Sequence, residues 1–249
     1  MSRVEVIPLS GVPEVKKGDD LGKLLLEAAE RNKVAWLDGD VVVVKHKIVS
    51  KSEGRVIELS GVSAGPEATR LAKREGKDPH LVELILREAV RIVREGHGVI
   101  ITQTRHGFVC ANSGIDQSNV GKGYAALLPL DPDGSARKLR AALESATGKA
   151  LAVVVSDTFG RPWRTGQTDV AIGCSGIAPL LKYAGKTDSY GYRLRVTEPA
   201  VVDEIAGAAE LSIGKLNGIP CAIVRGVEYS RGEGGMGELI MPSDKDLFR

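Results

Sequence analysis

A run of polar and charged residues, Ser156–Arg164, follows the apolar segment Leu151–Val155. That segment is continuously apolar, which is typical of a strand buried on both faces. Ligands of α/β folds bind beyond the carboxyl ends of such strands. There, Asp157 and Thr158 offer a carboxylate and a hydroxyl, oxygen ligands that suit a magnesium ion in a nucleotide site. The alternative is an ordinary strand end with a capping aspartate.

The same run contains two arginines, Arg161 and Arg164. Planar guanidinium groups suit two-point recognition of phosphates and carboxylates. We therefore interpret this pair as catalytic residues that hold a transferring phosphoryl group or the carboxylates of a substrate. The alternative is a pair of solvated surface side chains.

Two other segments have a similar character. Ala111–Asn119 is rich in small polar residues and contributes Asp116, a second candidate metal ligand, although such a segment alone is typical of an Asx-rich turn. Lys45–Arg55 follows four valines and contains four cationic residues, which suit phosphates unless they form a solvated edge. Acids, cations and small polar residues at strand ends together favour metal-dependent phosphoryl transfer from a nucleotide. No GxSxG or Cys-His pattern points to a nucleophilic hydrolase.

Two glycine motifs resemble phosphate-binding sequences without satisfying them. Gly185-Lys186-Thr187 lacks the earlier glycine of a P-loop, because Leu180 occupies that position. Gly232–Gly237 fits GxGxxG but leaves no room for a crossover helix and a ribose-binding acid after it. It is instead typical of a flexible loop or a mobile lid over a polar ligand. The four histidines are dispersed, so no zinc site is predicted.

The elements that must position these residues alternate along the chain. Strands are predicted at 4–8, 41–44, 55–59, 98–102, 125–130, 151–155 and 221–224, and helices at 21–31, 80–95, 135–147 and 198–216. This alternation predicts an α/β fold. The strongest turn, Asp131–Gly134, is a candidate lobe boundary.

Composition excludes several functional classes. The 249 residues carry a net charge of +2, only 4% are aromatic, and no basic stripe occurs, so nucleic-acid binding is not predicted. No apolar run reaches the roughly 18 residues of a membrane-spanning helix, and the first residues do not resemble a signal peptide. The three dispersed cysteines suit a reducing compartment. We expect a cytoplasmic protein.

The polar segments also carry a family resemblance. Ser156–Arg164 with Gln167–Gly173, Ala111–Asn119, His46–Lys51 and Gly11–Glu14 are similar to segments of the coenzyme F420 γ-glutamyl ligase family. The matches extend over nearly the whole chain, as in a stand-alone ligase. The resemblance implies a two-lobed mixed α/β fold with an unusual topology, neither P-loop nor Rossmann. We expect a larger lobe of 1–120 plus 200–249 and a smaller lobe of 121–199, in an intertwined homodimer.

The resemblance also implies ligands and their residues. It implies two divalent ions, Mg²⁺ or Mn²⁺, with Asp116 and Asp157 on one and Thr158 on the other, and stimulation by K⁺. Histidine at position 46 departs from the small polar residue expected there. The residues implied to contact the nucleotide are Val12, Pro13, Glu14, Val15, His46, Lys51 and Asn119.

The implied reaction consumes GTP and joins L-glutamate to a carboxylate of the F420 precursor through an acyl phosphate. Two other functions use the same residues. A metal-dependent nucleotidase or phosphatase would consume GTP without glutamate. A non-enzymatic deazaflavin or nucleotide carrier would bind its ligand and release no phosphate.

Overall fold

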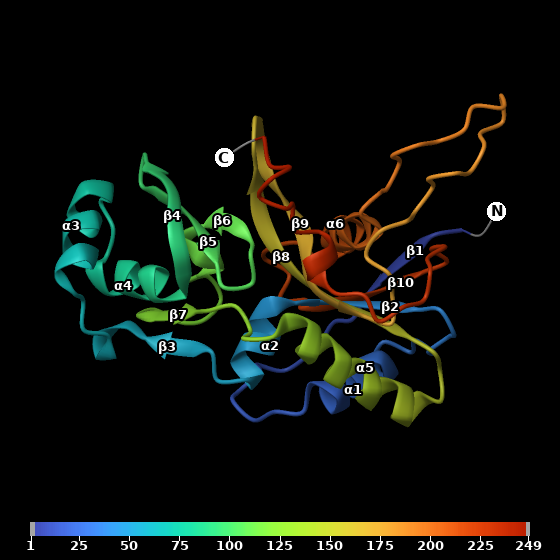
Figure 1. Cartoon of the computed structure of the whole chain (residues 1–249). Helices are drawn as coiled ribbons and strands as arrows, with labels where there is room; N and C mark the ends of the chain where they lie inside the picture. Colours follow the sequence, from blue (N-terminus) through green and yellow to red (C-terminus); the bar gives the residue numbers. More distant parts are fainter. Residues whose placement is uncertain (1–2, 248–249) are drawn as a thin grey trace.

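The computed structural model describes residues 3–247. Its largest sheet has the order β1-β10-β2-β8-β9 (Figure 1). These strands are Glu5–Pro8, Cys221–Arg225, Val41–Lys45, Ala152–Arg161 and Arg164–Ser175. Strands β2 and β8 are parallel, and the other pairs are antiparallel. With the helices between its strands, this sheet confirms the mixed α/β class.

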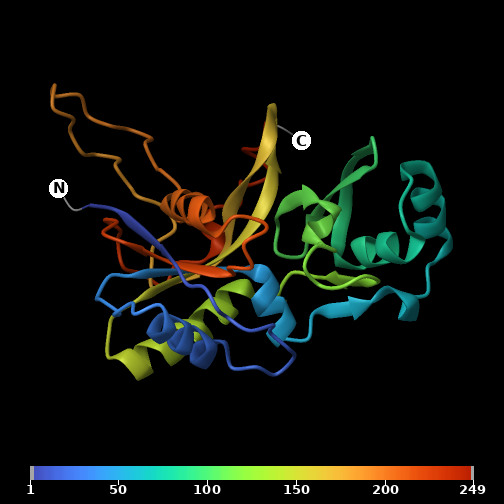
Figure 2. The ribbon, with the colours of Figure 1, turned by 180° about the vertical axis from the view of Figure 1, so that it is seen from behind.

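Helices cover both faces of this sheet. α1 (Leu21–Arg31) and α5 (Pro132–Thr147) lie beneath it, and α6 (Val201–Ile213) lies above it (Figures 1 and 2). Because β2 is covered on both faces, Val41–Val44 are all fully buried. No helix among the described residues is both long and apolar enough to span a membrane.

A second hydrophobic cluster is built from residues between Ile57 and Leu127. It contains the helices α3 (Pro66–Glu75) and α4 (Pro79–Glu88) and two small sheets, which lie to one side of the main sheet. These sheets are β4-β5-β6 and β3-β7. Their strands are Ala89–Gly96, Val99–Thr104, Val109–Ala111, Val56–Glu58 and Tyr124–Ala126. The lobe division at 121 and 199 stays a prediction.

The helix predicted over 80–95 is only half present. α4 ends at Glu88, and Ala89 already has an extended backbone with φ −87° and ψ 138°. The following residues form β4, which pairs with β5 through two irregularities in register. Val90, Ile92 and Val93 are β-branched and favour an extended backbone. Pairing with β5 therefore overrides the helical spacing of the apolar residues.

Three other segments also differ from the sequence prediction. The polar residues after Leu151–Val155 do not leave the sheet, because β8 continues to Arg161 and returns at Arg164 as β9. Positions 46–52, for which no helix is predicted from the sequence, form helix α2 (His46–Ser52). The turn at Asp131–Gly134 is the N-cap and first turn of α5, with the Asp131 side chain accepting from the amide of Gly134.

The glycine-rich segment 232–237 is tied to the main sheet. The Asp133 carboxylate accepts from the amides of Cys174 and Met236 at 2.8 and 3.1 Å. Glu233 pairs with Arg140 at 2.7 Å. The segment therefore closes over the end of β9, and these contacts favour a structural role over that of a mobile lid.

Gly173 of β9 permits the closest approach of α5 to the sheet, because a Cβ there would lie 2.5 Å from backbone atoms of Pro132. We expect Gly173→Ala to lower the free energy of unfolding by about 1–3 kcal/mol through overpacking. Gly207→Ala is the matched control, since Gly207 is helical and its Cβ would have only ordinary contacts, the nearest at 3.7 Å. Urea unfolding measures both. Equal stability of the two variants would contradict the predicted contact.

Candidate functional site

A cavity of about 1040 Å³ opens between the main sheet and the second cluster. Its floor lies at the carboxyl end of β2, where the parallel pairing with β8 ends with Lys45 in register with Ser156. The first turns of α2 lie at one side, and the segment after α6 lies at another. Ligands of α/β sheets commonly bind at such a position.

Most of the sequence-predicted site residues line this one cavity. They are Val12, Pro13, Glu14, Val15, His46, Lys51, Asp116, Asn119, Asp157 and Thr158. The three polar segments identified in the sequence therefore converge in space. Arg161 and Arg164 are not among the lining residues. They face each other at the end of the β8–β9 hairpin, beyond Gly160 and Gln167, which do line the cavity.

Asp157 is a buried carboxylate whose charge is poorly compensated. Its side chain accepts from the amide of Thr158 at 2.7 Å. The Nε2 atom of His46 lies 3.3 Å from Oδ1 but makes no hydrogen bond. Burial raises the pKa of Asp157, because water no longer stabilises its charged form. A cation in the cavity would supply the missing compensation.

His46 is held by contacts on its other side. Its Nδ1 atom lies 3.3 Å from Oγ of Ser50, and that hydroxyl donates to the carbonyl of Leu127 at 2.7 Å. Burial lowers the pKa of the His46 imidazole, which favours its neutral form. The imidazole is thus fixed with Nε2 towards Asp157.

Asp116 reaches the same cavity from the second cluster. Its backbone is anchored by hydrogen bonds with Ala126 in both directions, at 3.0 and 2.8 Å. Its carboxylate accepts from Nζ of Lys47 at 2.6 Å and from the amide of Ser118 at 2.7 Å. Partial burial acts to raise the pKa of Asp116, but these hydrogen bonds outweigh burial and lower it. Asp116 is therefore charged and lies among small polar groups.

A second charged group was missed by the sequence analysis. Asp169 is almost fully buried and accepts from the hydroxyls of Thr158 and Ser156 at 2.7 and 3.1 Å. Lys45 pairs with both Asp169 and Glu210. Burial acts to raise the pKa of Asp169, but hydrogen bonds from Lys45 and Thr158 outweigh it and lower that pKa.

The sequence held one indication of this group. Asp169 is the cross-strand partner of Thr158 in the β8–β9 register, so prediction of the hairpin would have placed the two side by side. Glu210 of α6 and Lys215 after it lie 2.8 Å apart, and no local motif distinguishes either residue. They reach the site only through the packing of α6 on the sheet.

The donor set fits a hard divalent cation that shares its coordination with a ligand. Within residues 3–247, no group of three or more His, Cys, Asp or Glu side chains is arranged to hold a metal ion. Asp116, Asp157 and the Thr158 hydroxyl nevertheless line one cavity. Mg²⁺ in nucleotide sites takes one or two carboxylates and completes its shell with phosphates and water. These residues fit that pattern.

Cationic side chains on the cavity wall favour an anionic ligand. They are Lys45, Lys47, Lys51 and Lys215. Lys51 pairs with Glu14 and so links α2 to the segment 12–15, whose Val15 is buried in the main core. Each of the four lysines pairs with a carboxylate, so a phosphorylated ligand would meet ammonium groups from several elements by exchanging these ion pairs for contacts with its own oxygens.

Comparisons with known proteins show the family of this chain. The family model described as F420-0:gamma-glutamyl ligase matches residues 11–226. The chain is 47% identical over 249 residues to the coenzyme F420:L-glutamate ligase of Methanothermobacter thermautotrophicus, with 99% of each chain covered. It is 44% identical to the protein of that name from Methanocaldococcus jannaschii, covering 99% of this chain and 97% of the relative. The chain belongs to the F420-0:gamma-glutamyl ligase family.

Proposed function

We propose that this chain is a GTP-dependent ligase that joins L-glutamate to the F420 precursor through an amide bond, and then adds further γ-linked glutamate. The names of its relatives support the substrates. One observation supports the chemistry: Asp116, Asp157, Thr158 and four lysines from separate segments line a single cavity.

The proposed reaction has two steps. A carboxylate oxygen of the precursor attacks the γ-phosphorus of GTP, so an acyl phosphate forms and GDP leaves. The glutamate amine then attacks the acyl carbon, inorganic phosphate leaves, and the amine loses a proton. Both steps develop negative charge on phosphate oxygens, which positioned cations stabilise.

Different residues of this chain would bind the metal ions, the phosphates and the nucleotide. Asp116 and Asp157 would hold one Mg²⁺ or Mn²⁺ and Thr158 a second, and these ions would offset charge on the transferred phosphoryl group. The lysines would pair with the remaining phosphate oxygens. Val12, Pro13, Glu14, Val15, His46, Lys51 and Asn119 would contact the nucleotide. Stimulation by K⁺ remains an expectation from the family resemblance.

The function is tested by product mass. Incubation with GTP, Mn²⁺, the F420 precursor and L-glutamate should add one or more glutamyl units to the precursor, with phosphate release that requires both substrates. A nucleotidase would release phosphate without glutamate and leave the precursor mass unchanged. A carrier would bind the precursor and release no phosphate. Either of these results would reject the ligase proposal.

The metal carboxylates are tested by removing one charge at constant size. Asp157→Asn and Asp116→Asn should each lower turnover roughly a hundredfold or more, since losing placed charge stabilisation costs about 3 kcal/mol. Elevated Mn²⁺ should restore part of the activity if the carboxylates bind it directly. Turnover is measured across a Mn²⁺ titration, with thermal unfolding as the control. Turnover like that of the unaltered enzyme at limiting Mn²⁺ would remove that residue from the site.

The homodimer is tested by mass in solution. The segment between β9 and α6 projects from the body of the chain and exposes Tyr190 and Tyr192 (Figure 1), as expected of an arm that contacts a second copy. Light scattering should give twice the 26.4 kDa of one chain. A mass of one chain over a wide concentration range would contradict the dimer.

A further inference from the structure

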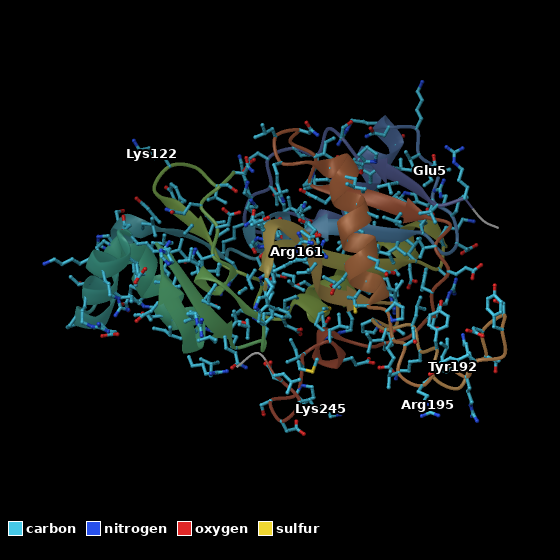
Figure 3. All side chains as sticks on the ribbon, turned by 90° about the horizontal axis from the view of Figure 1, so that it is seen from above. Glu5, Lys122, Arg161, Tyr192, Arg195 and Lys245 are labelled. Atoms are coloured by element: carbon cyan, nitrogen blue, oxygen red, sulfur yellow. The ribbon has the colours of Figure 1, made fainter. Side chains whose placement is uncertain are left out.

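The β8–β9 hairpin extends beyond the cavity that its base lines. Gly160 pairs with Gln167, and both line the cavity, whereas the next pair, Arg161 with Arg164, lies outside the lining. Figures 1 and 2 show the hairpin standing between β6 and α6 and projecting past both. In Figure 3, seen from above, Arg161 lies between the second cluster and α6. The end of the hairpin therefore lies at the mouth of the cavity.

Two like charges face each other at this end. Arg161 and Arg164 are cross-strand partners, an arrangement that is unfavourable unless an anion is shared. Within the described part of the chain, neither guanidinium forms an ion pair with a carboxylate, and Arg161 donates to the carbonyl of Thr165 at 3.2 Å. Two arginines so placed suit a phosphate or a phosphodiester.

The turn between the arginines holds a tryptophan in an unfavourable conformation. Trp163 has φ 56°, a region that glycine or asparagine adopts readily and that is an outlier for a bulky residue. It is nevertheless 78% exposed, so burial of the indole does not offset the strain. Strained residues of this kind cluster at ligand-binding sites. The exposed indole face is suited to stacking on a flat ring.

We infer that the hairpin end, defined as Arg161–Arg164, binds the distal part of the acceptor substrate. A flat heterocyclic ring stacks on Trp163, and a phosphate or phosphodiester of the same molecule pairs with Arg161 and Arg164. This inference rests on the proposed function, because it takes the reacting carboxylate of the acceptor to lie near Asp157 and Thr158.

Distance favours the acceptor over the nucleotide as occupant. A ring with an attached phosphate describes both molecules. Trp163 lies five residues beyond Thr158, a span of roughly 17 Å at 3.3 Å per residue. The ligand must therefore be elongated, with its reacting carboxylate at one end and its ring at the other. The residues assigned to the nucleotide, Val12–Val15 and Lys51, belong to other elements of the cavity wall.

The inference gives the arginines a role different from the catalytic one expected from the sequence. Neither arginine lines the cavity that holds Asp157 and Thr158, so we assign them to binding and positioning the acceptor rather than to the transferring phosphoryl group. Their removal should raise the KM for the acceptor and leave kcat and the KM for GTP nearly unchanged.

Steady-state kinetics test this with acceptor and GTP varied separately. Trp163→Ala should raise the acceptor KM at least fivefold, since stacking of a base on an aromatic side chain is worth about 1–3 kcal/mol. Trp163→Phe, which keeps an aromatic ring, should leave the acceptor KM close to that of the unaltered enzyme. Arg161→Gln and Arg164→Gln should each raise the acceptor KM. Val90→Ala, which shortens an apolar side chain that is 67% exposed on β4 and does not line the cavity, is the control and should change neither KM. An unchanged acceptor KM, or an equal rise in the KM for GTP, would overturn the inference.

Fluorescence provides a readout that does not depend on turnover. The chain has two tryptophans, so Trp36→Phe leaves Trp163 as the one indole emitter. The F420 precursor, without GTP or glutamate, should quench this emission saturably. An analogue of the precursor that lacks the phosphate should bind more weakly, and Arg161→Gln should reduce that difference. Absence of quenching would reject the subsite. Failure of the proposed function would appear separately, as absence of glutamyl product from the unaltered enzyme at any precursor concentration.

Discussion

The parallel pairing of β2 with β8 is the constraint on which the site depends. Both strands are buried runs of valine, and their register places Lys45 beside Ser156. Polar residues follow this pairing in both segments, in helix α2 after β2 and in the continuation of β8, so both sets lie at the same end of the paired strands. Shifting this register by one residue would exchange the two faces of β8 and so turn the Asp157 carboxylate to the opposite face of the sheet.

The two buried carboxylates that lie beyond this pairing, Asp169 and Asp157, have different environments. Asp169 is already balanced by Lys45 and by the hydroxyls of Ser156 and Thr158, which keep its pKa low despite burial. Asp157 accepts one hydrogen bond, from the amide of Thr158, and lies beside the His46 imidazole, whose pKa burial lowers; burial raises the pKa of Asp157 itself. The first carboxylate therefore organises the protein, and under the proposed function the second would be the one that meets a metal ion.

The sequence predicted the residues of the site better than it predicted the secondary structure that positions them. Segments around His46, Asp116 and Asp157 were identifiable because each joins small polar and charged residues to an apolar run, and the structure brings them together. Ala89–Gly96 was assigned to a helix because its apolar spacing fits one, whereas strand pairing decides its backbone. Glu210 and Lys215 could not be found, because only the packing of α6 on the sheet brings them to the site.

The same hairpin explains why one continuous segment can carry several roles. β8 and β9 form a long antiparallel pair, with Ser156–Thr158 at the cavity floor and Arg161–Arg164 at its mouth. Two paired strands resist bending more than a loop does, so the separation between these ends is nearly fixed. A ligand that reacts at one end and is recognised at the other is thereby selected for length as well as for chemistry. The close contact of Gly173 with Pro132 anchors β9 against α5 and holds the base of that hairpin in place.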